Sequence, residues 1–296
     1  MTSNLGMAAH HCVAQPDIGF VALGPAKVAV LGIVQGLTEL LPVSSTAHMR
    51  AIPALLGWPD PGAAFSASMQ LAALLAIVAY FRADIFDVTS GTIHAVRDRD
   101  WGNSALRTFL AVVVATVPIA VVGASLSGLL NSCNSVVRLP FVVGAACLLM
   151  ALVMGACEYF ARHRRKTADL TLFDALCIGL AQVGALIPGV SRSGATFGAA
   201  LGLGFQRQDA ARVSFLLGLP AITLAGLHEL WVLRGALDST GWSILILGLI
   251  VSSVSAFAAI WGLMRFLEHS STWLLVIYRA IFGSVLMVGA YLHWIR

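Results

Sequence analysis

The chain has 296 residues, of which 58% are hydrophobic and only 11% are charged, and its mean hydropathy is +0.87. A soluble domain normally devotes about a quarter of its residues to charge, so this composition excludes a soluble globular protein. The formal net charge of +4 is modest, and we expect a membrane lipid bilayer and no nucleic acid as partner.

The first 25 residues are predicted to be an N-terminal extension ahead of a single membrane domain over 26–296. They lack the basic stretch followed by a long apolar one that marks a signal peptide. His10 and His11 are a weak metal-site candidate, and we interpret the segment as a mobile extension. The five cysteines show no metal-ligand spacing, so we interpret them as small packing residues.

Six full membrane spans are predicted along the rest of the chain. A helix needs about 20 apolar residues to cross a hydrocarbon core of about 30 Å, and the apolar runs are continuous rather than alternating, as barrel strands would be. The fold class is therefore an all-α polytopic membrane protein. We place the spans at 62–82, 104–123, 136–160, 208–231, 242–264 and 272–295, with an amphipathic surface segment at 84–100.

Two further apolar stretches, 26–57 and 171–205, are each interrupted by Pro and a cluster of Ser, Thr and Gly. Each half of these stretches is expected to be too short to cross the membrane alone. Non-helical backbone at membrane depth survives only when it is buried in protein or lines a watery cavity. Both stretches are therefore predicted to be re-entrant helix hairpins whose tips meet inside the bundle.

The two breaks are related by one offset of 147 residues, which predicts an internal duplication over about 26–160 and 171–296. Lys and Arg concentrate in cytoplasmic loops, and eleven of the 18 basic residues fall in four segments that we place in the cytoplasm. The two halves then have opposite orientations, as in an inverted repeat. At this offset Gly32, Gln35, Ser44 and Thr46 correspond to Gly179, Gln182, Ser191 and Ser193.

The two breaks carry ionisable and hydroxyl side chains. In the first, Gln35 and Glu39 are four apart on a helix and share a face, and His48 lies one turn after Ser45. The second has "SRS" around Arg192. A helix N-terminus at each break would present free N–H groups to phosphate oxygens, and a guanidinium binds phosphate in a two-pronged manner. The remaining candidates for binding are Ser44, Ser191, Ser193 and Thr196.

Each residue also has a structural interpretation. Glu39 and Arg192 are also explained as an ion pair, His48 as a packing residue, and the hydroxyls as helix caps or polar contacts between helices. For the other polar residues in or near spans we favour bundle ion pairs and interface positions: Glu158, Asp174, His228, Glu229 and Arg279.

The segments "QGLTE" at 35–39, "LPVSSTAH" at 41–48 and "PGVSRSGAT" at 188–196 resemble the motifs of the undecaprenyl-diphosphate phosphatase family of bacterial inner membranes, also called the bacitracin-resistance family. The resemblance covers roughly 26–295. It implies hydrolysis of undecaprenyl diphosphate to undecaprenyl phosphate and phosphate, which recycles the lipid carrier for peptidoglycan. It also implies multi-pass insertion in the cell inner membrane and an active site facing the outer, periplasmic side.

By matching position, the resemblance assigns active-site roles to a set of residues in the two breaks: Glu39, Ser45, His48, Ser191, Arg192, Ser193 and Thr196. It also implies stimulation by a divalent cation, Mg²⁺ or Ca²⁺, with Glu39 as the candidate ligand. The chain departs from the family at Gln35, where many members have Glu, so we do not assume a metal held by two carboxylates. A homodimer stays open.

We expect Glu39, Ser45, His48 and Arg192 to be catalytic and Gln35, Ser44, Ser191, Ser193 and Thr196 to bind substrate. Ser45 is the preferred nucleophile because His48 is expected to take its proton, and attack by His48 or by water stays open. The competing hypothesis is a secondary transporter or lipid flippase, since inverted repeats with broken helices are typical of transporters.

Overall fold

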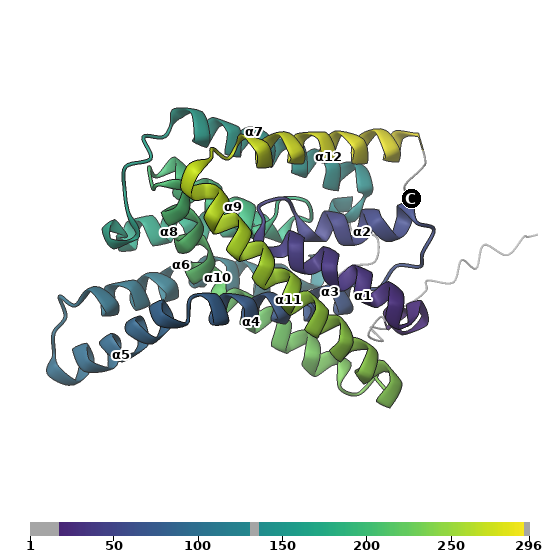
Figure 1. Ribbon diagram of the computed structural model, residues 1–296, viewed down its shortest axis with the longest axis horizontal. Helices are drawn as coiled ribbons and strands as arrows, with labels where there is room; N and C mark the ends of the chain where they lie inside the picture. The colour runs from purple at the N-terminus through teal and green to yellow at the C-terminus, as the bar shows by residue number, and fades with distance from the viewer. Residues whose placement is uncertain (1–17, 131–135, 293–296) are drawn as a thin grey trace, which may run out of the picture.

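The structure, a computed structural model, describes residues 18–130 and 136–292. Within these ranges the regular structure is helical, apart from one isolated bridge between Arg165 and Phe205, so the all-α prediction is confirmed (Figure 1). The α-helices are α1 (Gly19–Leu40), α2 (Ser45–Leu55), α3 (Ala63–Ser68), α4 (Gln70–Tyr80), α5 (Arg82–Asp98), α6 (Ser104–Leu130), α7 (Pro140–Phe160), α8 (Leu172–Val183), α9 (Arg192–Gly202), α10 (Arg207–Leu233), α11 (Ser239–His269) and α12 (Trp273–Tyr291). Short 3₁₀ turns lie at Val136–Arg138, Thr167–Asp169 and Gly184–Leu186.

Among the described residues, six helices are long and apolar enough to cross a membrane: α1, α6, α7, α10, α11 and α12. Five of them match predicted spans. The predicted span at 62–82 corresponds to α3 and α4, which bend by 78° into α5 and, taken together with α5, form a further candidate as a broken span or a re-entrant loop. Phe81 has non-helical backbone angles at this bend. The predicted surface segment corresponds to α5, of which only Ala95 is buried and which projects from the bundle beside α6 (Figure 1).

The sixth candidate span is α1, and this corrects the expectation that each half of a hairpin is too short to cross. Helix α1 has 22 residues because it begins upstream of the predicted hairpin and continues through a kink at Gly24–Pro25. The kink places Gly24 at φ 75°, a conformation that favours glycine. Residues 1–17 of the predicted extension lie outside the described part of the chain.

The two predicted breaks lie between α1 and α2 and between α8 and α9. Each break ends on a serine with positive φ, Ser44 at 77° and Ser191 at 69°, immediately before the helix that follows. The tips meet, since the Ser193 hydroxyl lies 3.0 Å from the Glu39 carbonyl oxygen and 3.1 Å from that of Leu41. The expectation of meeting tips is therefore confirmed.

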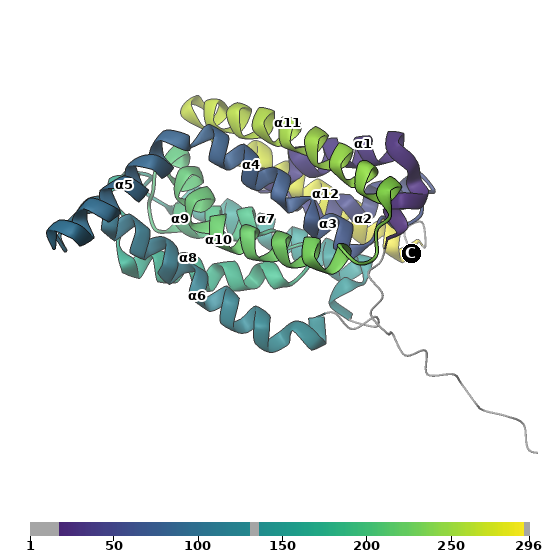
Figure 2. The same cartoon turned by 90° about the horizontal axis from the view of Figure 1, so that it is seen from below.

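Close helix crossings at glycine hold the helices that lead into the breaks. A Cβ added to Gly179 of α8 would lie 2.5 Å from the Ala115 carbonyl oxygen of α6, and one on Gly32 of α1 would lie 3.0 Å from the Gly248 carbonyl oxygen of α11. Small residues allow such approaches between membrane helices. Figures 1 and 2 both show α11 lying along α1. Each break is thus anchored by a long helix, and the inverted repeat stays a prediction.

Candidate functional site

The carboxylate of Glu39 is the centre of a polar cluster at the meeting tips. Its Oε1 accepts a hydrogen bond from Nη2 of Arg192 at 2.6 Å. Its Oε2 accepts from Nε2 of Gln35 at 2.9 Å and from Oγ of Ser45 at 2.5 Å. Glu39 is only 6% exposed, so its charge needs these partners. The structure brings together four predicted residues from both hairpins.

Local helix geometry places each member of this cluster. Gln35 and Glu39 share one face of the last turns of α1. The break at Leu41–Ser44 then reverses the chain, so that Ser45 begins α2 next to the carboxylate. Arg192 begins α9 in the same way. Glu39 and Arg192 therefore form an ion pair, and among the described residues the Nε and Nη1 groups of Arg192 have no hydrogen-bond partner.

The hydroxyls of the second tip stabilise the tip itself. Ser191 caps α9, because its Oγ accepts from the Gly194 N–H at 3.1 Å. Thr196 donates to the Arg192 carbonyl oxygen at 2.9 Å and lies 2.6 Å from the Ser214 hydroxyl. Ser44 is fully buried, and its hydroxyl has no hydrogen-bond partner within the described residues.

His48 does not pair with Ser45, in contrast to the expectation from their spacing. Its Nδ1 lies 2.8 Å from the Ser44 carbonyl oxygen and its Nε2 lies 2.7 Å from the Tyr278 hydroxyl. A carbonyl oxygen only accepts, so Nδ1 carries a proton, and in the neutral ring Nε2 accepts from Tyr278. The ring also stacks on Phe282, with ring centroids 3.9 Å apart. The nearest acceptor for the Ser45 proton is therefore Glu39 rather than His48.

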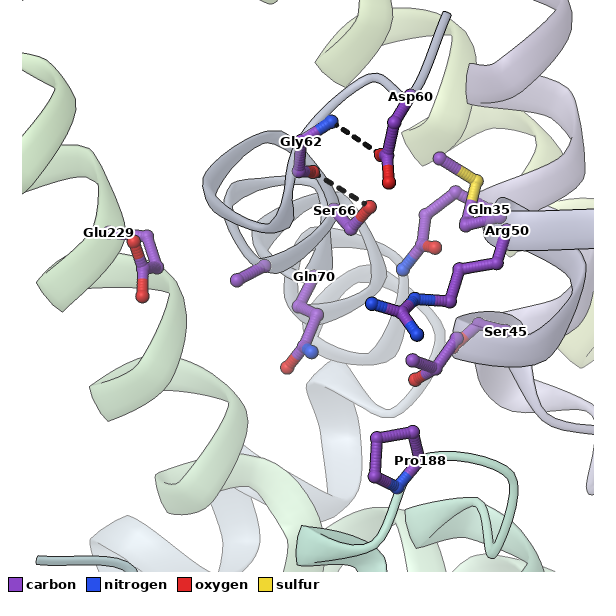
Figure 3. Close-up of a pocket in the computed structure, with 12 residues that line it drawn as sticks. Gln35, Ser45, Arg50, Asp60, Gly62, Ser66, Gln70, Pro188 and Glu229 are labelled. Atoms are coloured by element: carbon purple, nitrogen blue, oxygen red, sulfur yellow. Dashed lines mark hydrogen bonds between the residues drawn. The ribbon is translucent and has the colours of Figure 1, made fainter. Parts of the chain in front are cut away.

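A cavity of about 230 Å³ opens beside Ser45 and Gln35 (Figure 3). Figure 3 shows the Arg50 guanidinium between Gln35 and Ser45, and Pro188 of the second tip on the other side of the cavity. Gln70 of α4 and Glu229 of α10 also line it. Arg50 was not among the site residues predicted from sequence, although a basic residue within an apolar helix, five positions after Ser45, is a signal for this site.

Glu158 and Asp174 form ion pairs between parts of the bundle, as predicted, whereas Glu229 and Arg279 have other surroundings. Glu158 pairs with Arg207 at 2.6 Å and Asp174 with Arg165 at 2.5 Å, as bundle ion pairs were predicted. Glu229 lines the cavity instead. Arg279 donates to backbone carbonyl oxygens and has no carboxylate within ion-pair distance in the described part of the chain.

The described residues do not fit a divalent cation held by protein groups alone. They contain no cluster of three or more Asp, Glu, His or Cys side chains that could hold one. The Glu39 carboxylate already accepts three hydrogen bonds, one from a guanidinium. A cation such as Mg²⁺ requires oxygen ligands around it, and the requirement for Mg²⁺ or Ca²⁺ stays a prediction.

The fold and this cluster define a multi-pass membrane protein with a polar site buried where two broken helices meet. The family described as "Bacitracin resistance protein BacA" matches residues 28–285. The chain belongs to this family.

Similar proteins carry a name that describes an activity. The chain is 57% identical over 263 residues to undecaprenyl-diphosphatase 2 of Mesorhizobium japonicum, covering 88% of this chain and 100% of that protein. It is 44% identical over 265 residues to the undecaprenyl-diphosphatase of Gloeobacter violaceus, covering 90% of this chain and 91% of the relative. The family match over 28–285 includes both breaks.

Proposed function

We propose that this protein is a membrane-embedded phosphatase that hydrolyses undecaprenyl diphosphate to undecaprenyl phosphate and inorganic phosphate. Family membership and the names of its relatives support this activity. The observation that carries the proposal is the Ser45 hydroxyl, 2.5 Å from the Glu39 carboxylate, which in turn pairs with Arg192. A nucleophile, a proton acceptor and a phosphate-binding guanidinium are thus in one cluster.

In the proposed reaction, Ser45 Oγ attacks the terminal phosphorus and transfers its proton to Glu39. The new O–P bond forms as the bridging P–O bond breaks, and undecaprenyl phosphate leaves. Arg192 binds the phosphoryl oxygens with its remaining N–H groups and stabilises their charge. Water then hydrolyses the phosphoserine and releases inorganic phosphate, with the proton on Glu39 returned to the serine oxygen.

The cavity beside Ser45 is the proposed site of the diphosphate. It is lined by Arg50, which the distribution of Lys and Arg places near the outer surface. This supports an active site facing the periplasmic side of the bacterial inner membrane. The product would return as a lipid carrier to peptidoglycan synthesis, and removal of the diphosphate would confer resistance to bacitracin.

The deciding experiment measures phosphate release from undecaprenyl diphosphate by the purified protein in detergent, where no transport is possible. We expect release by the wild type and a loss of about 100-fold or more in kcat for Glu39→Gln, because the amide cannot accept the proton as a carboxylate does. No release by folded wild-type protein would contradict the proposal and favour the transporter or flippase hypothesis. Adding a chelator and then Mg²⁺ or Ca²⁺ tests the cation requirement in the same assay.

A further inference from the structure

Arg279 of α12 is a fully buried guanidinium that contacts both helix breaks. Its Nη1 donates to the Pro42 carbonyl oxygen of the first break at 2.8 Å. Its Nη2 lies 2.5 Å from the carbonyl oxygens of both Gly189 and Val190 in the second break. Its Nε donates to the Cys147 carbonyl oxygen of α7 at 3.1 Å. One side chain therefore joins α7, α12 and the two tips.

Arg279 donates hydrogen bonds to carbonyl groups that the two breaks leave without helical partners. A break in a membrane helix leaves carbonyl groups without helical partners, and each is costly unless it is hydrogen-bonded. The planar guanidinium carries five N–H donors in a fixed fork, so a single Arg reaches carbonyls on two separate segments. A Lys ammonium is a compact charge with a different donor geometry and would not satisfy the same set.

We propose that Arg279 is a positioning residue that holds the two tips in the relative placement at which Glu39, Ser45 and Arg192 meet. This inference rests on the proposed function.

The Val190 carbonyl points to Arg279, and in a trans peptide the next N–H points the opposite way. The Ser191 N–H, at the start of α9, is therefore directed away from Arg279.

Arg279 also biases the site electrostatically. The charges of Glu39 and Arg192 offset each other in their ion pair. Arg279 has no carboxylate within ion-pair distance among the described residues, and its carbonyl partners carry only partial charge. A buried positive charge next to both tips favours an anionic diphosphate in the adjoining site.

Two substitutions at Arg279 separate positioning from charge. Arg279→Lys keeps the charge and loses the fork, whereas Arg279→Gln keeps an amide donor and loses the charge. Because small displacements of reacting groups cost about 100-fold in rate, we expect kcat per folded protein to fall about 10- to 100-fold in both variants. The control is Arg207→Lys, which disturbs the Arg207–Glu158 pair and is expected to lower thermal stability while leaving kcat and KM unchanged.

The native thiol of Cys147 provides a readout that does not require activity. Cys147 is fully buried, and its Sγ donates to the Gly189 carbonyl oxygen at 3.3 Å. In a background with no other cysteine, we expect a small maleimide to label Cys147 about tenfold faster or more in both Arg279 variants. The rate in Arg207→Lys should stay at that of the unsubstituted protein. A tenfold increase corresponds to a free energy about 1.4 kcal/mol lower for the local opening that exposes Cys147.

Wild-type kcat and an unchanged labelling rate in folded Arg279→Lys would overturn the inference. A Lys variant with wild-type kcat beside an inactive Gln variant would also overturn it, because charge alone would then suffice. If the wild type releases no phosphate, the proposed function fails, whereas Cys147 labelling still tests whether Arg279 holds the tips.

Discussion

Ser45 and His48 illustrate how a residue's role depends on which neighbour its polar atom contacts. Their spacing predicts a Ser–His pair, yet the Ser45 hydroxyl donates to Glu39 and both His48 ring nitrogens have other partners. The α2 helix that carries both residues leaves His48 turned toward Tyr278 and Phe282 of α12. A tertiary contact thus separates two side chains that sequence spacing associates.

The nucleophile can be tested by comparing Ser45→Ala with His48→Ala. If Ser45 attacks and Glu39 takes its proton, Ser45→Ala loses at least about 1,000-fold in kcat. His48→Ala then keeps substantially more activity, since its ring does not contact the Ser45 hydroxyl. The measurement is phosphate release together with trapping of the phosphoenzyme under both acidic and basic conditions. A base-stable, acid-labile adduct would instead identify His48 as the nucleophile, and inversion at phosphorus with no adduct would identify water.

Arg192→Lys is expected to lose most activity while the protein folds normally. The substitution keeps the charge that balances Glu39 but removes the two-pronged contact with phosphate, so kcat should fall about 100-fold. Thermal unfolding and size-exclusion chromatography serve as folding controls. Phosphate release close to that of the wild type by a folded Arg192→Lys protein would argue against phosphate binding by this guanidinium.

Arg50→Leu is expected to raise KM about tenfold or more with little change in kcat. Arg50 lines the cavity beside Ser45, and a hydrogen bond to a charged group contributes about 1.5–3 kcal/mol. Lys27→Met is the matched control, because Lys27 lies over the Trp58 ring rather than in the cavity. Equal KM values for Arg50→Leu and the control would mean that Arg50 does not bind substrate.

At the scale of helices, glycine contacts determine how closely the elements that carry the site approach. Gly179 lies where α8 crosses α6, and any side chain there meets the backbone of Ala115 rather than a flexible side chain. Because α8 leads directly into the second break, a change in this crossing also displaces Arg192. Packing at the α6–α8 crossing therefore affects the geometry around the Glu39 carboxylate.

Gly179→Ala should destabilise the protein by about 1–3 kcal/mol, the usual cost of overpacking, and should also lower kcat. Gly262→Ala in α11 is the control, since a Cβ there meets nothing within 4 Å. It is expected to keep wild-type activity and to be neutral or stabilising by up to about 1 kcal/mol. Equal melting temperatures for the two variants, measured in the same detergent, would refute a close α6–α8 crossing.

The breaks themselves were predictable from sequence, whereas the helix lengths around them were less so. Pro and hydroxyl clusters interrupt otherwise apolar segments, and both breaks appear at the expected positions. The prediction that each half of the first hairpin is too short to cross the membrane was wrong, because α1 continues upstream through Gly24–Pro25. Helices α3 and α4 lie within the predicted span at 62–82, and the bend at Phe81 comes at its end, where α5, the predicted surface segment, begins.

For the whole molecule, the testable property is orientation in the membrane. The distribution of Lys and Arg places the segment after α10 outside and the segment after α7 inside. We expect an impermeant thiol reagent, added to intact cells, to label Gly235→Cys and not Ala168→Cys in a cysteine-free background. Both positions are exposed, so labelling after cell disruption controls for accessibility. The reverse pattern would exclude an outward-facing site.

Composition and local pattern were enough to predict a polytopic α-helical membrane protein, its two broken segments and most residues of the polar cluster. These features follow from rules that act over a few neighbouring residues: a span length, a proline break, two side chains four apart on a helix. The ion pair of Glu39 with Arg192, 153 positions apart, was one of two interpretations open from sequence, whereas the contacts of His48 and Arg279, with partners 230 and 237 positions away, were not predicted. Such partners depend on how the helices cross, and the crossings depend on close backbone approaches that no local pattern contains.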